Sequence, residues 1–202
     1  MKRAYFVTGI DTDAGKSIVT GVLARALSAR GERVITQKFI QTGCDGLSED
    51  IETHRRIMGI VFTYPASPHL AAAIDGRDID LTLIGRSTEK LLQKYDTVLI
   101  EGAGGLYVPL LEAYQTIDYV AEHGLPVVLV TSPRLGSINH TLLSLEACRN
   151  RNIEVAAVAY NLYPPAPEPI VRDLKAYLAD RFPAARWLEV NDRYELIGPD
   201  RP

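Results

Sequence analysis

The chain has 202 residues with a formal net charge of −3, and 47% of its residues are hydrophobic and 23% charged. This balance predicts a globular protein with one domain over residues 1–202, and an acidic chain without a basic cluster argues against nucleic acid as the main partner. No apolar run is long enough to predict a membrane span, and two distant cysteines, Cys44 and Cys148, suit a reducing cytoplasm rather than a disulfide framework.

Short β-branched runs alternate with segments of helical periodicity along the chain. A buried strand is predicted over residues 4–8 (AYFVT), and a helix follows from Lys16 to Arg30, where Gly31 ends it. Further strands are predicted over residues 33–40, 97–100, 126–131 and 155–159, and further helices over 81–95, 138–150 and 170–178. This alternation predicts an α/β fold with a mostly parallel sheet covered by helices on both faces.

The segment TGIDTDAGKS, Thr8–Ser17, joins the first predicted strand to the first predicted helix, which is the position of a phosphate-binding loop. Its glycines let the backbone approach phosphates, and the N–H groups of the loop and of the helix start point at them. Lys16 would reach the β- and γ-phosphates, and the Ser17 hydroxyl would bind Mg²⁺. Five residues separate Gly9 from Gly15 where the usual motif has four. The segment predicts a P-loop NTPase-like fold, and the alternative is an ordinary strand–helix turn.

Two charged residues lie at or near the ends of other predicted strands. Glu101 ends an apolar strand and precedes GAGG, which is the place of a carboxylate that helps to hold Mg²⁺ in phosphate-loop enzymes. The alternative is an acid that caps a loop. Lys38, in QKFIQTG, lies in a buried strand or at its exit and therefore needs an anionic partner, such as phosphate or a carboxylated substrate. The alternative is a lysine whose amine reaches the solvent at the strand end.

Six segments in this order, TGIDTDAGKS, KFIQTG, SEDIETHR, SPH, EGAGGLYVPL and LGSINH, together resemble dethiobiotin synthetase, and the match extends to about Asn161. The resemblance implies a cytoplasmic ATP-dependent cyclo-ligase of biotin biosynthesis that uses Mg²⁺. Such an enzyme converts 7,8-diaminopelargonic acid, CO2 and ATP into dethiobiotin, ADP and phosphate. One amine captures CO2 as a carbamate, a carbamate oxygen attacks the γ-phosphate, and the second amine closes the ureido ring.

The resemblance also implies a role for individual residues. Nucleotide binding would fall to Asp13, Ala14, Gly15, Lys16, Ser17, Ile18 and Glu101, with Asn161 contacting the base. The Mg²⁺ ligands would be Ser17, Asp50 and Glu101, with Glu49 or Glu52 as alternatives to Asp50, which also suits the start of an acidic helix. The catalytic residues would be Lys16, Lys38 and Thr12. The diamine or its carbamate would contact Thr12, Lys38 and Thr42, the last standing where the family often has serine.

A further segment is implied to bind the far end of the substrate. The family forms a homodimer in which the helix start of one subunit receives the carboxylate of substrate bound by the other. The matching residues here are Gly136, Ser137, Ile138 and Asn139, at the start of a predicted helix whose unpaired N–H groups would attract an anion. On sequence alone, the alternative is that Ser137 caps its own helix.

Two other functions stay open at this point. One is an amide-forming enzyme akin to the cobyrinate amidation group, which usually carries a glutaminase domain for which this chain has no room. The other is a nucleotide switch of the partition-protein type, which typically has an extra lysine where this sequence has Ile10 and Asp11. The preferred base of the nucleotide is also open, because the resemblance does not extend beyond Asn161.

Overall fold

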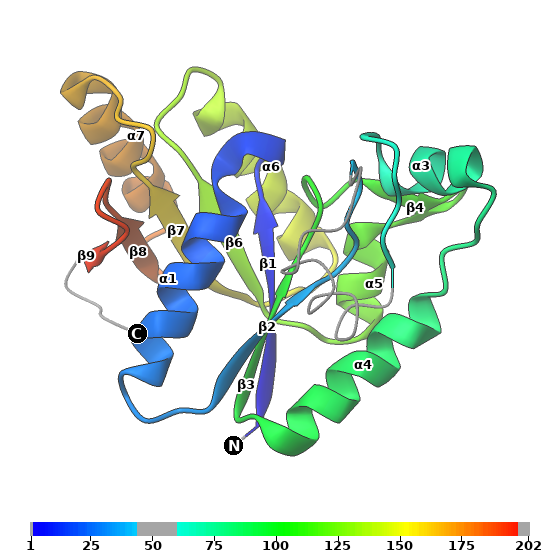
Figure 1. Ribbon diagram of the computed structural model, residues 1–202. Helices are drawn as coiled ribbons and strands as arrows, with labels where there is room; N and C mark the ends of the chain where they lie inside the picture. Colours follow the sequence, from blue (N-terminus) through cyan, green and yellow to red (C-terminus); the bar gives the residue numbers. More distant parts are fainter. Residues whose placement is uncertain (1, 44–59, 198–202) are drawn as a thin grey trace.

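A twisted, mostly parallel sheet runs through the centre of the protein (Figure 1). The computed structural model describes residues 2–43 and 60–197, and within these ranges the sheet has seven strands. Their spatial order is β2 (Val34–Lys38), β3 (Thr97–Glu101), β1 (Arg3–Gly9), β6 (Val127–Thr131), β7 (Val155–Asn161), β8 (Trp187–Val190) and β9 (Leu196–Ile197). All neighbouring strands pair in parallel except β8 and β9, which are antiparallel.

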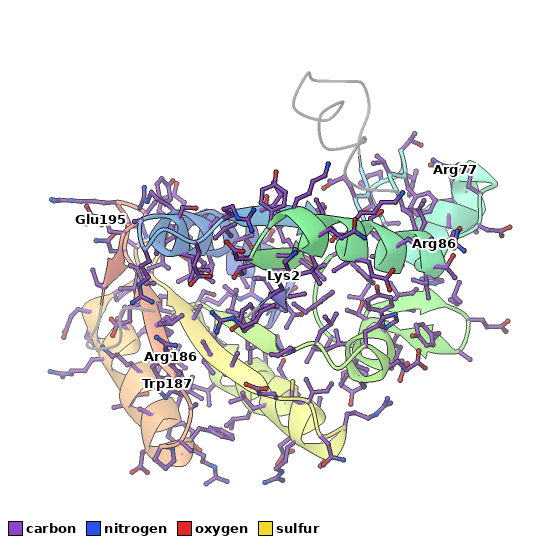
Figure 2. All side chains as sticks on the ribbon, turned by 90° about the horizontal axis from the view of Figure 1, so that it is seen from below. Lys2, Arg77, Arg86, Arg186, Trp187 and Glu195 are labelled. Atoms are coloured by element: carbon purple, nitrogen blue, oxygen red, sulfur yellow. The ribbon has the colours of Figure 1, made fainter. Side chains whose placement is uncertain are left out.

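Helices cover both faces of this sheet. Figure 2 shows α1 (Lys16–Ser28) and α4 (Leu81–Lys94) on one side, and α5 (Thr116–Glu122), α6 (Ser137–Asn150) and α7 (Glu168–Arg181) on the other. Every residue of β3 and β6 is buried, because each of these strands meets helices on both faces. Trp187, labelled in Figure 2, packs with Leu174 and Leu178 of α7 and so fixes that helix against the edge of the sheet.

A smaller layer lies beside the main sheet. The helix α3 (Pro68–Asp75) contacts strand β4 (Pro109–Leu111), which forms a two-stranded antiparallel sheet with β5 (Tyr114–Gln115). Figure 1 shows this layer close to the carboxyl ends of β2 and β3. It therefore flanks the edge of the sheet at which ligands bind in open α/β folds.

The connectivity identifies a binding position on this edge. After β1 the chain continues through α1 to β2 on one side, whereas the strand on the other side of β1 is β6. The order of the strands thus reverses direction around β1, and such switch points leave a crevice beyond the strand ends. The loop between β1 and α1 lies at this point. Among the described residues, the helices are too short or too polar to cross a membrane.

The predicted parallel sheet with helices on both faces is confirmed, and most predicted bounds shift by up to three residues, as at β1, β7 and α7. Two of these corrections have a clear local cause. The first helix ends at Ser28 rather than Arg30, because residues 28–31 form a turn in which the Gly31 N–H donates to the Ser28 carbonyl. The second strand ends at Lys38 rather than residue 40. The Phe39 N–H still donates to the Glu101 carbonyl, but Gln41 then pairs with Val61 outside the main sheet.

Candidate active site

A cavity of about 820 Å³ opens at the carboxyl edge of the sheet. Its walls come from the loop after β1, the ends of β2 and β3, residues 65–68 and residues 163–164. The predicted site residues that line it are Thr12, Asp13, Gly15, Lys16, Ser17, Ile18, Lys38, Thr42 and Glu101. Segments that are far apart in the sequence therefore meet in one cavity.

The phosphate loop contains an extra turn. The Asp11 carboxylate accepts a hydrogen bond from the Thr12 N–H at 2.6 Å and begins a short 3₁₀ helix, η1 (Thr12–Ala14). This turn lies in the interval in which the loop is one residue longer than the usual motif. Gly15 follows with a φ of 88°, and a Cβ atom there would lie 2.1 Å from Nδ2 of Asn161. The conformation and the close contact both require glycine at this position.

The amine of Lys16 is held inside the loop. Its Nζ donates to the main-chain carbonyls of Asp11 at 3.0 Å and of Thr12 at 2.9 Å, and the residue is 6% exposed. Burial, followed by the positive charge of Lys38, lowers the pKa of Lys16 from 10.5 to about 8. An anionic group beside the amine would offset both effects, because it favours the charged form of the lysine.

Glu101 connects the loop to the neighbouring strand. Its Oε1 atom accepts a hydrogen bond from the Ser17 hydroxyl at 2.6 Å and forms an ion pair with Lys38. Lys38 and Glu101 are partners in the register of β2 and β3, so the pairing of the strands sets this ion pair. Glu101 is 8% exposed, so its charged carboxylate needs such a partner. The expected anionic partner of Lys38 was a phosphate or a carboxylated substrate, which stays a prediction, and in this structure the partner is Glu101.

Ser17 and Glu101 present a hydroxyl and a carboxylate oxygen side by side at the phosphate loop. Oxygen atoms of this kind suit Mg²⁺, which usually takes one or two protein carboxylates together with phosphate oxygens and water. In residues 2–43 and 60–197 no group of three or more His, Cys, Asp or Glu side chains is placed so that it could hold a metal ion. Asp50, the third expected ligand, and its alternatives Glu49 and Glu52 lie outside the described residues.

Asn161 and Ala14 lie behind the wall of the cavity. The Asn161 side chain is fully buried, and its Nδ2 donates to the carbonyls of Ala14 at 3.1 Å and of Tyr163 at 2.8 Å. Asn161 thus connects the end of β7 to the phosphate loop across 147 residues of sequence. Its contact with a nucleotide base stays a prediction.

The segment Gly136–Asn139 does not line this cavity. Gly136 is the N-cap of α6 with a φ of 92°, so Ser137 is the first residue of the helix and not its cap. The Ser137 side chain is fully buried, and its hydroxyl has no hydrogen-bond partner among the described residues. Arg134, two residues before this segment, forms an ion pair with Asp11 of the phosphate loop.

Several residues of the site were not predicted. Ser67 and Pro68, which belong to the SPH segment, line the cavity. Tyr163 lines it beside Pro164, and Arg134 pairs with Asp11. A usable signal for Tyr163 and Arg134 was their place in the chain, because both follow predicted strands and so lie at the carboxyl edge of the sheet.

The fold resembles those of several solved structures at low sequence identity. A ParA family ATPase from Chlorobium tepidum matches with a TM-score of 0.53 and 14% identity, covering 93% of this chain and 82% of that chain. A cobyrinic acid a,c-diamide synthase from Mycobacterium smegmatis, with bound ADP and magnesium, matches with a TM-score of 0.52 and 17% identity over 90% of this chain and 82% of that chain. These matches confirm the P-loop NTPase-like fold, and at this identity they say nothing further about function.

Sequence relatives are much closer. Residues 3–182 match a family described as an AAA domain. The ATP-dependent dethiobiotin synthetase BioD 2 of Pasteurella multocida is 50% identical over 192 residues, which are 88% of this chain and 90% of the relative. The ATP-dependent dethiobiotin synthetase BioD of Chlorobaculum tepidum is 51% identical over 187 residues, 86% of this chain and 78% of the relative. With such identity over most of its length, the chain belongs to the ATP-dependent dethiobiotin synthetase family.

Proposed function

We propose that this chain closes the ureido ring of dethiobiotin in the cytoplasm, as a single catalytic domain. One amine of 7,8-diaminopelargonic acid attacks CO2 and, after losing a proton, becomes a carbamate. A carbamate oxygen attacks the γ-phosphorus of ATP, and ADP leaves. The second amine attacks the carbonyl carbon of the resulting carbamic–phosphoric anhydride, the ring closes, and phosphate leaves.

The two lysines in the cavity suit the phosphoryl transfer. Lys16 is held by the Asp11 and Thr12 carbonyls, so its charge is fixed in position before the nucleotide arrives. Lys38 approaches from the end of β2. Positive charges that are already positioned stabilise the charge that spreads over the transferring group, and they need little rearrangement during the reaction. Thr12 and Thr42 line the same cavity and would bind the carbamate or the diamine through their hydroxyl groups.

The remaining residues would bind the nucleotide and its metal ion. Residues 13–18 would surround the phosphates with N–H groups, and Asn161 would support the base end of the site from behind the loop. Ser17 and Glu101 would hold Mg²⁺, together with Asp50. When bound, the ion supplies charge neutralisation on the β- and γ-phosphates. The Oε1 atom of Glu101 contacts both the Lys38 amine and the Ser17 hydroxyl, so the carboxylate is already positioned beside Ser17 for this role.

The substrate's carboxylate would bind at the start of α6 in a second subunit of a homodimer. Gly136 and Asn139 are exposed at this helix start, whose N–H groups would attract an anion, whereas the Ser137 side chain is fully buried and would contact the carboxylate only after a local rearrangement. Leu135, next to this segment, is 98% exposed, and Leu143 of the same helix is 56% exposed. Exposed leucines beside an anion-binding helix start suit a surface that a partner subunit covers.

The observation that carries this proposal is that Lys16, Lys38, Ser17 and Glu101 share one cavity in a chain of this family. The test is to measure ADP release with and without diaminopelargonate and bicarbonate, and to follow labelled carbon into the product. Release of ADP should require both compounds. Equal hydrolysis of ATP without the diamine would contradict the proposal and favour a nucleotide switch.

A further inference from the structure

Tyr163 forms part of the wall of the cavity that also holds the phosphate loop. It follows β7 by two residues, and together with Pro164 it lines the same cavity as the phosphate loop. The residue is 39% exposed, so part of its side chain is accessible to a ligand. Neither the phosphate loop nor the proposed diamine site accounts for an aromatic side chain at this place.

The backbone of Tyr163 is fixed by Asn161. The Tyr163 N–H donates to Oδ1 of Asn161 at 3.3 Å, and the Tyr163 carbonyl accepts from Nδ2 at 2.8 Å. The second amide proton of Asn161 is used by the carbonyl of Ala14. Both donor positions of Asn161 are therefore occupied within the protein, and its side chain is fully buried. In this arrangement Asn161 has no proton left to donate to a base.

The ring of Tyr163 is fixed from the other side. It packs against the ring of Tyr194, with centroids 5.5 Å apart and an angle of 62° between the planes. Hydrogen bonding with the Tyr163 side chain also raises the pKa of the Tyr194 phenol. Tyr194 belongs to the turn between β8 and β9, and its carbonyl accepts a hydrogen bond from Arg25 of α1. The helix α1 begins at the phosphate loop. Tyr163 is therefore connected to this loop twice, once through Asn161 and once through Tyr194 and Arg25, and both connections fix its position relative to Lys16.

We propose that the Tyr163 ring is the surface on which the nucleobase stacks, and that Asn161 acts as a positioning residue that aligns this surface with the phosphate loop. The inference rests on the proposed function only in taking the ligand to be a nucleoside triphosphate. An aromatic platform recognises the face of a base, which all bases have, rather than its hydrogen-bonding edge. The base therefore contributes affinity through stacking, and the phosphate loop contributes through charge.

The test separates the base from the phosphates by using two ligands, MgATP and magnesium tripolyphosphate, which has no base. Their dissociation constants are measured by calorimetry, without diamine, for the wild type, Tyr163→Ala, Tyr163→Phe and Tyr177→Ala. Tyr177 lies on α7, is 45% exposed and does not line the cavity, so its variant is the matched control. In Tyr163→Ala, the loss of one base–aromatic contact is expected to raise the dissociation constant of MgATP by about 10-fold to 100-fold. Tripolyphosphate binding should be unchanged, and Tyr163→Phe and Tyr177→Ala should bind MgATP as the wild type does.

Two outcomes would overturn the inference. One is an unchanged dissociation constant for MgATP in Tyr163→Ala. The other is an equal loss for MgATP and tripolyphosphate, which would mean that the variant disturbs the phosphate loop through Asn161 and not the base. If Tyr163→Ala does not fold, Tyr163→Leu replaces it, because leucine keeps an apolar side chain but has no aromatic face. A wild type that binds MgATP but makes no dethiobiotin would contradict the proposed function and leave this test valid.

Discussion

Lys16 shows how one residue can be prepared for an anion before the anion is present. Its amine is nearly buried, its hydrogen bonds go to two carbonyls of its own loop, and another lysine lies close enough to disfavour its charge. The pKa of about 8 reflects these costs. Phosphate oxygens would offset them, so part of the free energy of nucleotide binding comes from relieving an unfavourable charge.

This arrangement predicts that MgATP affinity depends on pH through Lys16. The free lysine begins to lose its proton near pH 8, whereas a phosphate-bound lysine keeps its proton to higher pH. Binding therefore takes up a proton in this range, and affinity should fall by up to about tenfold per pH unit above about pH 8. Calorimetric titrations from about pH 7 to about pH 9.5 measure the slope of the logarithm of MgATP affinity against pH. Lys16→Ala should bind weakly with little slope over this range, and an equal slope in that variant would assign the effect to another group.

At the scale of elements, an ion pair joins two of the loops at the carboxyl edge of the sheet. Asp11 opens η1 in the phosphate loop, and Arg134 lies in the segment between β6 and α6. The guanidinium of Arg134, together with the Thr12 N–H, lowers the pKa of Asp11. Both side chains are partly exposed, so the pair adds little to the free energy of unfolding. Its main effect is to fix the loop whose carbonyls hold Lys16.

We expect Asp11→Asn and Arg134→Gln each to raise the dissociation constant of MgATP by about 3-fold to 10-fold, with little change in the melting temperature. The double variant should be no worse than either single variant, because both remove the same interaction. Arg149→Gln is the control, since Arg149 forms an exposed pair with Glu146 within α6. Losses that add in the double variant would show that the two residues act separately.

At the scale of the whole molecule, the sequence predicted those elements whose pattern is local and long. The strands β3 and β6 are buried runs rich in β-branched residues, β1 is buried over its second half, and α1, α4 and α6 are each 13 or 14 residues long. The helices α3 and α5 have 8 and 7 residues, which is too short for a helical period to stand out. The strand β8, next to the edge strand β9, was not predicted because it has only four residues and one of them, Glu189, is charged.

The same distinction applies to the site. The loop residues and Glu101 were predicted because a motif or a strand end marks them in the sequence. The contacts of Asn161 with Ala14, and of Tyr163 with Tyr194, depend on how β7 and the β8–β9 turn meet the loop. Such contacts between distant segments leave no local pattern, and so they became visible only in three dimensions.

The proposed shared site predicts that two inactive variants can restore each other's activity. Lys16→Ala removes the phosphate lysine, and Gly136→Val disturbs the helix start, where the φ of 92° favours glycine. In a random mixture half of the dimers contain one subunit of each kind, and each of these has one intact site. Activity should therefore return to about a quarter of the wild-type level after mixed refolding. Mixed dimers that form, as judged by native mass spectrometry, but stay inactive would contradict the shared site.

The contact between Gly15 and Asn161 has a consequence for the order in which the protein matures during synthesis. The phosphate loop leaves the ribosome long before Asn161 is made, yet the Ala14 carbonyl obtains its bond from Asn161 only after β7 has paired with β6. Contacts between residues so distant in the sequence form late, because the cost of closing the intervening chain must be met first. The motif synthesised early is thus among the last to reach its final shape, and a nascent chain lacking β7 should be unable to retain ATP.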